Sequence, residues 1–498
     1  MAMINNTLVM LALFFPHQGE DQAAAAKFPE KEVKLLVQQS MDYWRVPGVA
    51  IAIVHQGETL FESGFGVVEI SKKKPVSTST VFPIASCTKA FTSALAASLI
   101  SKKKLDWDDK VQKHLPWFKL SEPLATEDCR LRDLFCHRTG LGSNDLLWYR
   151  SGLKPEENVR RAAFLQLDKP FRSAYQYQSI MYSAGGLVCE KAGKESWEKL
   201  LQQNILDPLG MKNTVVMHPS ENLARGHFIG QFGFPEVKEP YISAFPDPSG
   251  SIYSSAHDLA SWLKFQVDPA HQKFAGMGFA PQLFETHKPQ VVNPLEDLNK
   301  LLHPFTVQMS YGLGWVIQDY RGIKLVSHAG AIDGFRTHIA MVPEAKFGLV
   351  VLSNLEHTRM NLALSNSLVD LLFNFSRVEW DKNYAYIMAD GLQKSKIAYD
   401  NNLVELLKKF PGSLKLTDVL GEYQNPAYGK IELKMQGKNV RLVVGNHFVD
   451  LDHLGSSILH ARDFFFDNPV LTFSRDSSAK ITGFKISGRL NAEFVKLP

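Results

Sequence analysis

The chain lacks several features that would mark a specialised class of protein. Its 498 residues include only four cysteines, with no Cys-x-x-Cys pair and no Cys/His cluster, so neither a metal site nor a dense disulfide framework is expected. No uninterrupted apolar run reaches the ~20 residues of a membrane span. The formal net charge of +4 is small for this length and does not indicate nucleic-acid binding.

What remains is the composition of an ordinary globular protein, with 45% hydrophobic and 21% charged residues. The length suffices for two or three domains. At the N-terminus, a short apolar run at 7–15 and four alanines at 23–26 resemble parts of a signal peptide, but no basic residue precedes the run and two acidic residues follow it. Residues 1–27 are therefore interpreted as a leader or signal-like segment. A cleaved signal would place the protein in the periplasm or outside the cell; otherwise it is cytoplasmic.

Helical and strand-like patterns alternate between residues 28 and 378. Strand patterns occur near both ends of this region, at 49–66 and 312–352, and the part between them is mostly helical. This arrangement predicts an α+β domain with one antiparallel sheet, flanking helices and an all-α subdomain. The stretch 275–306, rich in Pro, Gly and His, is predicted to be loop.

The residue pattern changes after a charged helical connector over 379–411. Residues 412–498 contain short alternating strands separated by glycine or asparagine turns. This pattern predicts a small C-terminal antiparallel β-barrel or sandwich domain.

The stretch around Ser86 combines a strand-like run with an apolar, alanine-rich helix. Lys89 follows Ser86 by three residues, a spacing that places the lysine amine near the serine hydroxyl on one helical turn. A lysine without its proton can accept the proton of a serine, which then acts as a nucleophile. This pair is a candidate nucleophile and base.

The pattern alone is weak, because Ser-x-x-Lys occurs seven times in the chain. Most copies lie among surface charges, as at Ser71, where a solvated loop is a sufficient interpretation. Only the copy at Ser86 has apolar sequence on both sides, which a capping serine with a surface lysine does not need. Context, and not the motif, singles out Ser86.

Two further stretches carry groups that could take part in the same chemistry. Tyr177 precedes a helix, and a tyrosine near a lysine can relay a proton, although, for this stretch taken alone, a packed aromatic ring with a satisfied hydroxyl is the more common case. His328 and Gly330 lie where a strand reaches a turn, and glycine there allows close approach of a backbone. His-x-Gly recurs elsewhere, so this signal is not specific.

Taken in order, the three stretches resemble the serine β-lactamase and penicillin-binding protein superfamily, in its class C-like branch of esterases and peptidases. In that family Ser-x-x-Lys is followed by Tyr-x-Asn and then by Lys-Thr-Gly or His-x-Gly. Family-like sequence extends over about 30–375, including Cys136-His137-Arg138-Thr139-Gly140-Leu141. The C-terminal domain resembles the lipocalin-like module of some hydrolases in this branch.

The resemblance implies a role for each matched position. Ser86 would be the acylated nucleophile, with Lys89 and Tyr177 as base and proton relay, in an order that stays open. The oxyanion hole would be formed by the backbone N–H groups of Ser86 and Ala331. The resemblance also implies a substrate-binding surface made of Ser179, His328, Gly330, Trp148 and Tyr149.

Two departures from the family pattern bear on the substrate. Ser179 stands where the family has asparagine, and a hydroxyl cannot match the paired donor and acceptor of an amide. His328 stands where many members have lysine, and histidine is mostly neutral at pH 7. Both changes favour esters or small amides over β-lactams.

The sequence therefore predicts a serine hydrolase that acts through an acyl-enzyme on a small ester, an amide or a short peptide. No cofactor, metal or nucleic acid is expected, and a homo-oligomer is an open option. The alternatives are a D-amino-acid peptidase, a β-lactamase or a penicillin-binding protein that acylates but barely turns over. A further alternative is a non-catalytic binding or oligomer-forming protein on the same fold.

Overall fold

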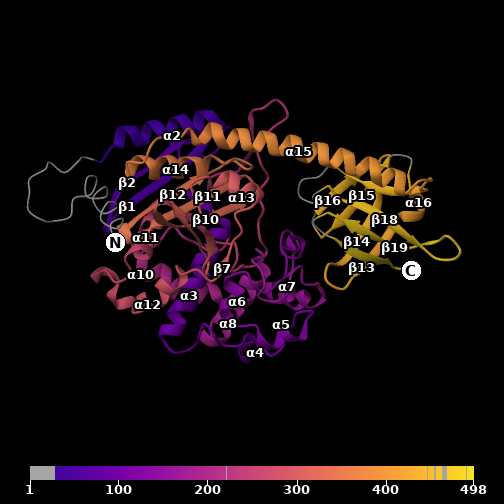
Figure 1. Ribbon diagram of the computed structural model, residues 1–498, viewed down its shortest axis with the longest axis horizontal. Coiled ribbons are helices and arrows are strands. Elements are labelled where there is room, and N and C mark those ends of the chain that lie inside the picture. The colour runs from indigo at the N-terminus through magenta and orange to yellow at the C-terminus, as the bar shows by residue number, and fades with distance from the viewer. Residues whose placement is uncertain (1–27, 220, 446, 454–455, 462–467, 489–490) are drawn as a thin grey trace, which may run out of the picture.

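The structure is a computed structural model that describes residues 28–219, 221–445, 447–453, 456–461, 468–488 and 491–498. The predicted leader, residues 1–27, lies outside the described residues. Figure 1 shows a larger body of helices and strands and a smaller all-β body, joined by the long helix α15 (Trp380–Lys409). The predicted fold class is confirmed.

The larger body is organised on an eight-stranded antiparallel sheet with the order β2-β1-β12-β11-β10-β9-β8-β7. The two ends of the larger body meet in this sheet, since β1 pairs with β12. The strands are β1 (Gly48–His55), β2 (Glu58–Gly66), β7 (Val291–Val292), β8 (Met309–Tyr311), β9 (Val316–Tyr320), β10 (Ile323–Ile332), β11 (Phe335–Val342) and β12 (Phe347–Ser353).

Helices cover both faces of this sheet, which is why β1 is buried at every residue and reads as a continuous apolar run. On one face, α2 (Glu30–Trp44) and α14 (Met360–Leu372) pack with Ile51 in one cluster. On the other, α3 (Thr88–Ser101) and α11 (Ala256–Val267) pack with Ala52 in a second cluster. Figure 1 shows α2 and α14 above the sheet and α3 and α11 below it.

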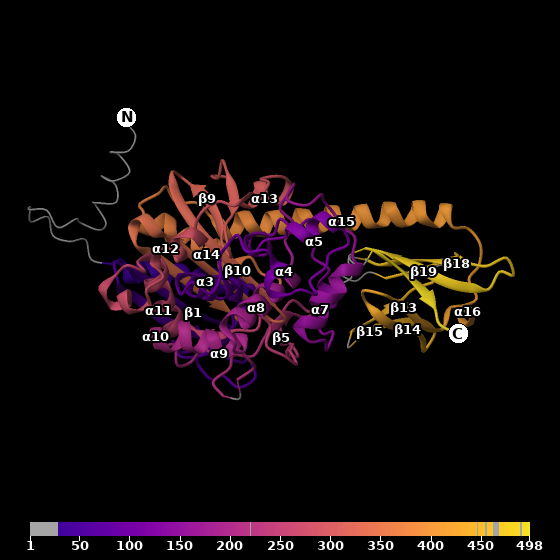
Figure 2. The ribbon, with the colours of Figure 1, turned by 90° about the horizontal axis from the view of Figure 1, so that it is seen from below.

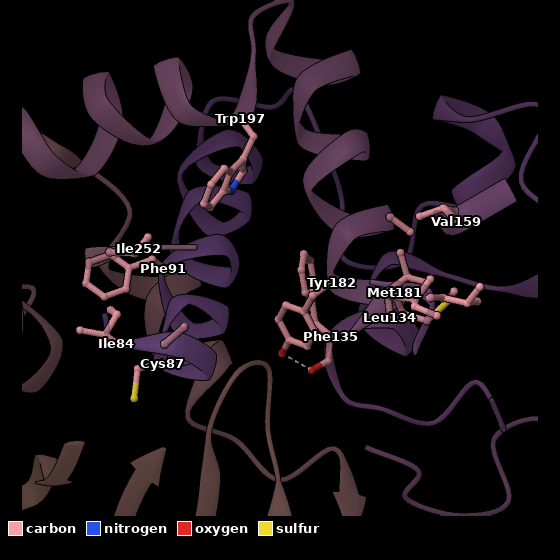
Figure 3. Close-up of a cluster of buried hydrophobic side chains, with 14 of the residues drawn as sticks. Ile84, Cys87, Phe91, Leu134, Phe135, Val159, Met181, Tyr182, Trp197 and Ile252 are labelled. Atoms are coloured by element: carbon pink, nitrogen blue, oxygen red, sulfur yellow. Dashed lines mark hydrogen bonds between the residues drawn. The ribbon is translucent and has the colours of Figure 1, made fainter. Parts of the chain in front are cut away.

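A helical subdomain fills the region between β2 and α11. Its helix α8 (Ile180–Gly193) packs beside α3, and Figure 3 shows Tyr182 of α8 beside α3, with Phe91 on the other side of α3. The Tyr182 hydroxyl donates a hydrogen bond to the Phe135 carbonyl. The other helices are α4 (Val111–His114), α5 (Pro123–Asp128), α6 (Leu131–Phe135), α7 (Pro155–Arg161), α9 (Trp197–Leu201) and α10 (Asp207–Leu209).

Two short pairs of strands and several single turns complete the larger body. The strands β3 (Val81–Pro83) and β6 (Tyr253–Ser255) form one antiparallel pair, which joins the approach to Ser86 to a segment about 170 residues away. The other pair consists of β4 (His227–Ile229) and β5 (Pro235–Val237). The turns are η1 (Ala85–Cys87), η2 (Asp145–Leu147), η3 (Ala162–Phe164), η4 (Gln202–Leu206), η5 (Gln272–Met277) and η6 (Pro343–Ala345).

The prediction of a loop over 275–306 was wrong. This stretch contains α12 (Ala280–Thr286), strand β7 and α13 (Asp297–Leu302). Proline does not prevent α12, because Pro281 lies in the first turn, where its missing N–H has no helical partner to lose. The buried side chains of Leu283 and Leu302 anchor the two helices.

The smaller body is a nearly closed eight-stranded antiparallel barrel with the order β16-β15-β14-β13-β20-β19-β18-β17. A bridge between Asp452 and His460 connects the two ends of this order. Buried and less buried residues alternate along β15, as in a sheet with one face in a core. The elements are α16 (Leu416–Val419), β13 (Gly421–Asn425), β14 (Gly429–Gln436), β15 (Asn439–Val444), β16 (His447–Leu451), β17 (Ile458–His460), β18 (Val470–Arg475), β19 (Ile481–Ser487) and β20 (Ala492–Lys496).

The barrel lies beside the helical subdomain. Figures 1 and 2 both place α7 on the side of the larger body that faces the barrel. The contact is direct, since the Arg161 guanidinium donates to the Ala427 carbonyl at 3.3 Å. In the part of the chain that the structure describes, no helix combines the length and apolar character needed to cross a membrane.

Candidate active site

Ser86 lies on the short turn η1, between strand β3 and helix α3. Ala85, just before it, has φ 45°, in the left-handed region that non-glycine residues rarely adopt. Such backbone strain is concentrated at functional sites, where the surrounding structure holds it. Ser86 itself is half-buried, whereas Ala85 and Cys87 are buried. The turn thus presents the Ser86 side chain at the end of a buried helix.

Lys89 lies in the first turn of α3 and is fully buried. Its Nζ is 3.3 Å from Ser86 Oγ, 3.3 Å from Ser179 Oγ and 3.0 Å from the Ser249 carbonyl oxygen. No carboxylate forms an ion pair with Lys89 among the described residues. The amine therefore lies within hydrogen-bond distance of two hydroxyl groups and is surrounded by neutral oxygen atoms. Its proximity to Ser86 is what the sequence spacing predicts.

Tyr177 lies next to this group, with its ring centroid 5.0 Å from Lys89 Nζ. Its segment is held by His137, whose carbonyl accepts the Gln176 N–H at 2.8 Å and whose Nδ1 accepts the Gln178 N–H at 3.3 Å. The His137 ring also packs 4.4 Å from the Tyr177 ring, centroid to centroid. His137 therefore fixes both the backbone and the ring of the tyrosine segment.

No role was predicted for His137, although it is part of the family-like stretch that includes residues 136–141. It is fully buried and has φ 61°. Burial, followed by the charge of Lys89, holds the pKa of His137 well below its ordinary value, so the ring is neutral. Its Nε2 has no hydrogen-bond partner among the described residues. Its place within the family-like stretch was the sequence signal that could have pointed to it.

His328 is buried beneath the site and does not line its cavity. Its Nδ1–H donates to the Ala329 carbonyl at 2.7 Å, and its Nε2 lies 2.9 Å from the Tyr311 hydroxyl. Burial, and then the charge of Lys89, lower the pKa of His328 to about 3. At neutral pH the ring is uncharged and both nitrogens are engaged, so it presents no cation to a substrate.

Gly330 brings strand β10 against the turn that carries Ser86. A Cβ atom at Gly330 would lie 2.1 Å from the Ile84 carbonyl oxygen, so no side chain fits there. The carbonyl oxygen of His328, on the same strand, accepts a hydrogen bond from the Cys87 thiol at 3.4 Å. This close packing brings Ala331 to the cavity that Ser86 lines.

The cavity beside Ser86 has a volume of about 30 Å³. Four of the predicted residues line it, namely Ser86, Ser179, Ala331 and Trp148. The other lining residues were not predicted, namely Ala85, Tyr241, Ser243, Asp247, Ser249, Gly250, Ser251 and Ile332. Beyond Trp148 and Tyr241 a wider cleft of about 240 Å³ continues. A larger cavity of about 460 Å³ lies elsewhere, between α2 and α15, and contains none of these residues.

Tyr149 does not line the cavity beside Ser86, although Trp148 does. Its hydroxyl donates to Asp333 Oδ1 at 2.5 Å, and Arg150 pairs with the same carboxylate at 2.5 Å. Burial, and then the hydrogen bond to Asp333, raise the pKa of Tyr149 above its ordinary value. The Tyr149 ring lies 5.0 Å from that of Tyr241, so it supports the wall from behind.

Comparison with known proteins assigns this arrangement to a family. Residues 33–371, more than half of the chain, match the beta-lactamase family model. The chain belongs to the beta-lactamase family. The fold of a serine hydrolase, expected from the motifs around Ser86, is thereby established for this beta-lactamase family member.

Two relatives illustrate how far the similarity extends. The unguisins hydrolase ungD of Aspergillus violaceofuscus is 26% identical over 82% of this chain and 76% of its own length. The protein flp of Staphylococcus aureus is 26% identical over 66% of this chain and 63% of its own length.

Two solved structures share the fold. The octameric penicillin-binding protein homologue from Pyrococcus abyssi has a TM-score of 0.63 at 20% identity, covering 94% of this chain and 100% of its own. EstCE1, described as a hydrolase with promiscuous acyltransferase activity, has a TM-score of 0.60 at 19% identity, covering 69% of this chain and 98% of its own.

Proposed function

We propose that this beta-lactamase family member cleaves esters or small amides through an acyl-enzyme on Ser86. The observation that carries the proposal is the buried Lys89 amine, 3.3 Å from the hydroxyls of both Ser86 and Ser179. Ser86 Oγ and Ala331 border one cavity, where a carbonyl group would lie between nucleophile and oxyanion donors.

The reaction proceeds in two steps, acylation of Ser86 and hydrolysis of the acyl-enzyme. Ser86 Oγ forms a bond to the carbonyl carbon and gives its proton to Lys89 or Tyr177, while the bond to the leaving group breaks and that group takes up the proton. Water then adds to the acyl carbon, and the ester bond to Ser86 breaks as its oxygen regains a proton. The backbone N–H groups of Ser86 and Ala331 stabilise the oxyanion in both steps.

The preference for esters and uncharged amides rests on the charges around the cavity. His328 is neutral and turned away from it, and Ser179 replaces the amide of the family pattern. The Asp247 carboxylate lines the wall and would repel an anionic substituent. A β-lactam or a free peptide carboxylate close to the reacting carbonyl is therefore disfavoured.

Hydrolysis of an unguisin is the second candidate, since the name of the Aspergillus relative states that it is an unguisins hydrolase. We propose in addition that the chain forms a homo-oligomer, because the Pyrococcus homologue with the same fold is described as octameric. Light scattering of the purified protein tests the assembly, and a single-chain mass would contradict it.

The central experiment is intact-mass spectrometry after exposure to a fluorophosphonate. Hydrolysis of p-nitrophenyl acetate, a chromogenic cephalosporin and an unguisin is measured alongside. Ser86→Ala is compared with Ser477→Ala, which removes an exposed serine from another Ser-x-x-Lys copy. We expect one adduct on Ser86, ester turnover reduced by at least about 10³-fold in Ser86→Ala only, and little cephalosporin hydrolysis.

Other outcomes point to the alternatives. An acyl adduct that forms on Ser86 with the cephalosporin and is released only over hours would indicate a penicillin-binding type of protein. No adduct and no turnover in the wild type would overturn the proposal and favour a non-catalytic binding or assembly role.

A further inference from the structure

One wall of the active-site cleft is a segment with little regular structure, residues 144–153, here called the wall segment. Its Trp148 side chain lines both the small cavity at Ser86 and the wider cleft. Arg150 and Leu153 line the wider cleft as well. Apart from the single turn η2, the wall segment contains no helix or strand. Its position therefore depends on side-chain contacts.

The back of the wall segment rests on two loops of the C-terminal barrel. The Tyr428 hydroxyl, in the loop before β14, donates to Asn144 Oδ1 at 2.8 Å. At the other end, the His447 ring at the start of β16 lies 4.8 Å from the Tyr149 ring. Between these, a Cβ built on Gly445 would lie 3.4 Å from the Arg150 carbonyl oxygen, so the two backbones are in close contact.

The front of the wall segment is tied to the strand that supplies Ala331. Both Tyr149 and Arg150 bind the carboxylate of Asp333, two residues after Ala331. A shift of the barrel loops would therefore reach the cleft through Tyr149 and Arg150. Trp148, between these anchors and the cavity, would move with them.

The wider cleft has room for a bulky group. It has a volume of about 240 Å³ and is bordered by apolar side chains such as Trp148 and Leu153 and by polar ones such as Arg150, whereas the cavity at Ser86 has only about 30 Å³. A substrate with one compact side and one bulky side would fit both spaces.

We propose that the C-terminal barrel is a specificity element that braces the wall segment and so selects esters or amides with one bulky side. The proposal rests on the proposed function at Ser86. Tyr428 and His447 are positioning residues in this scheme, because they act on the cleft through the wall segment. Compact substrates do not reach the cleft and are insensitive to the barrel contacts.

The test uses the full-length chain and two esters. Ethyl acetate is compact on both sides of its carbonyl, and p-nitrophenyl octanoate is bulky. The variants are Tyr428→Phe, which removes only the hydroxyl, and His447→Ala. The control is Phe448→Ala, which removes a neighbouring ring that is 58% exposed. kcat and KM are measured for both esters, and urea unfolding monitors stability.

We expect Tyr428→Phe and His447→Ala to raise KM for the bulky ester by about fivefold, the effect of one lost hydrogen bond or ring contact. The kcat/KM for ethyl acetate should stay within about twofold, and Phe448→Ala should change neither ester. Equal losses on both esters, or no change on either, would overturn the proposal.

A second readout does not depend on turnover. Hydrogen–deuterium exchange of residues 144–153 should become faster in Tyr428→Phe and His447→Ala but not in Phe448→Ala. Unchanged exchange would overturn the bracing role. A wild type that hydrolyses no ester and takes no fluorophosphonate adduct would instead be a failure of the proposed function, visible before any barrel variant is made.

Discussion

The two sides of the candidate active site are built in different ways. Ser86, Lys89 and Ser179 come from elements of the core, and the lysine is completely buried. Trp148 comes from a segment without regular structure, whose back rests on a second domain. The difference teaches that the reacting groups are fixed by the same packing that stabilises the fold, whereas the substrate wall can change without disturbing that core.

The largest effect is expected on the core side, at Lys89. Lys89→Met keeps much of the side-chain volume and should lower kcat for p-nitrophenyl acetate by about 10²–10⁴-fold, because the proton acceptor is lost. Lys102→Met, in an exposed lysine just after the same helix, is the control. A comparable loss in Tyr177→Phe, with little loss in Lys89→Met, would transfer the role of general base to the tyrosine.

A substitution at Gly330 tests how closely strand β10 must approach the turn that carries Ser86. Gly330→Ala should lower ester turnover more than tenfold and reduce the free energy of unfolding by about 1–3 kcal/mol, since a Cβ would meet the Ile84 carbonyl oxygen. Gly391→Ala has open space in α15 and should raise stability by about 0.5–1 kcal/mol. Turnover and urea unfolding are the measurements. Normal activity in Gly330→Ala would show that the approach need not be so close.

His137 tests whether the tyrosine segment belongs to the core side. His137→Ala should lower kcat about tenfold at similar KM, because Tyr177 loses its support. His137→Asn should restore part of this, since asparagine offers an acceptor and tolerates φ 61°. The control His338→Ala removes another buried histidine, which binds Ser365 at 2.8 Å away from the cavity. If both alanine variants lower kcat equally, the effect of His137 is general destabilisation.

The pH dependence of stability sharpens the description of the core side. Burial lowers the pKa of His328 from 6.5 to about 3, so the unfolded chain binds the proton first as the pH falls. The stability contribution of neutral His328 is present above pH 6.5 and is lost between pH 6.5 and 3, by about 1.4 kcal/mol per pH unit at most. Urea unfolding of His328→Gln should show a shallower slope in this window. An unchanged slope would mean that His328 is accessible to protons in the folded state.

The smallest effect is expected on the wall side. Trp148→Ala should raise KM for p-nitrophenyl octanoate by about fivefold and leave kcat within about twofold, because the indole binds substrate equally before and during the reaction. A loss confined to kcat would mean that Trp148 acts with the core side, and the distinction between the core side and the wall side would no longer hold.

On the core side, Ser86 and Lys89 could be predicted from the residues themselves because their signal is local, whereas Ser179 came only from the family resemblance and His137 was missed. The spacing of Ser86 and Lys89 and their apolar surroundings determine that the two side chains meet on one buried turn. Continuous apolar strands predicted the sheet, and alternating strands predicted the barrel. Such patterns predict structure because the residues that repeat with the period of a strand or helix are the ones that become buried.

Apart from Trp148, the residues that line the wall side could not be predicted, since they meet only through tertiary contacts. Tyr241, Asp247 and Ser249 lie far along the chain from Ser86, in a segment without periodicity. Trp148 and Tyr149 are adjacent, yet one lines the cavity and the other binds Asp333. No sequence rule states which of two neighbouring aromatic rings in an irregular segment faces a cavity.

The long helix α15 restricts which insertions and deletions this chain can accept during evolution. Each residue of an α-helix adds a rotation of about 100° and a rise of about 1.5 Å, so the barrel is held in a fixed angular phase as well as at a fixed distance. Deleting one residue within Trp380–Lys409 would turn Tyr428 and His447 away from the wall segment. Substitutions on the exposed surface of α15 are therefore expected to accumulate freely, whereas its length is under constraint.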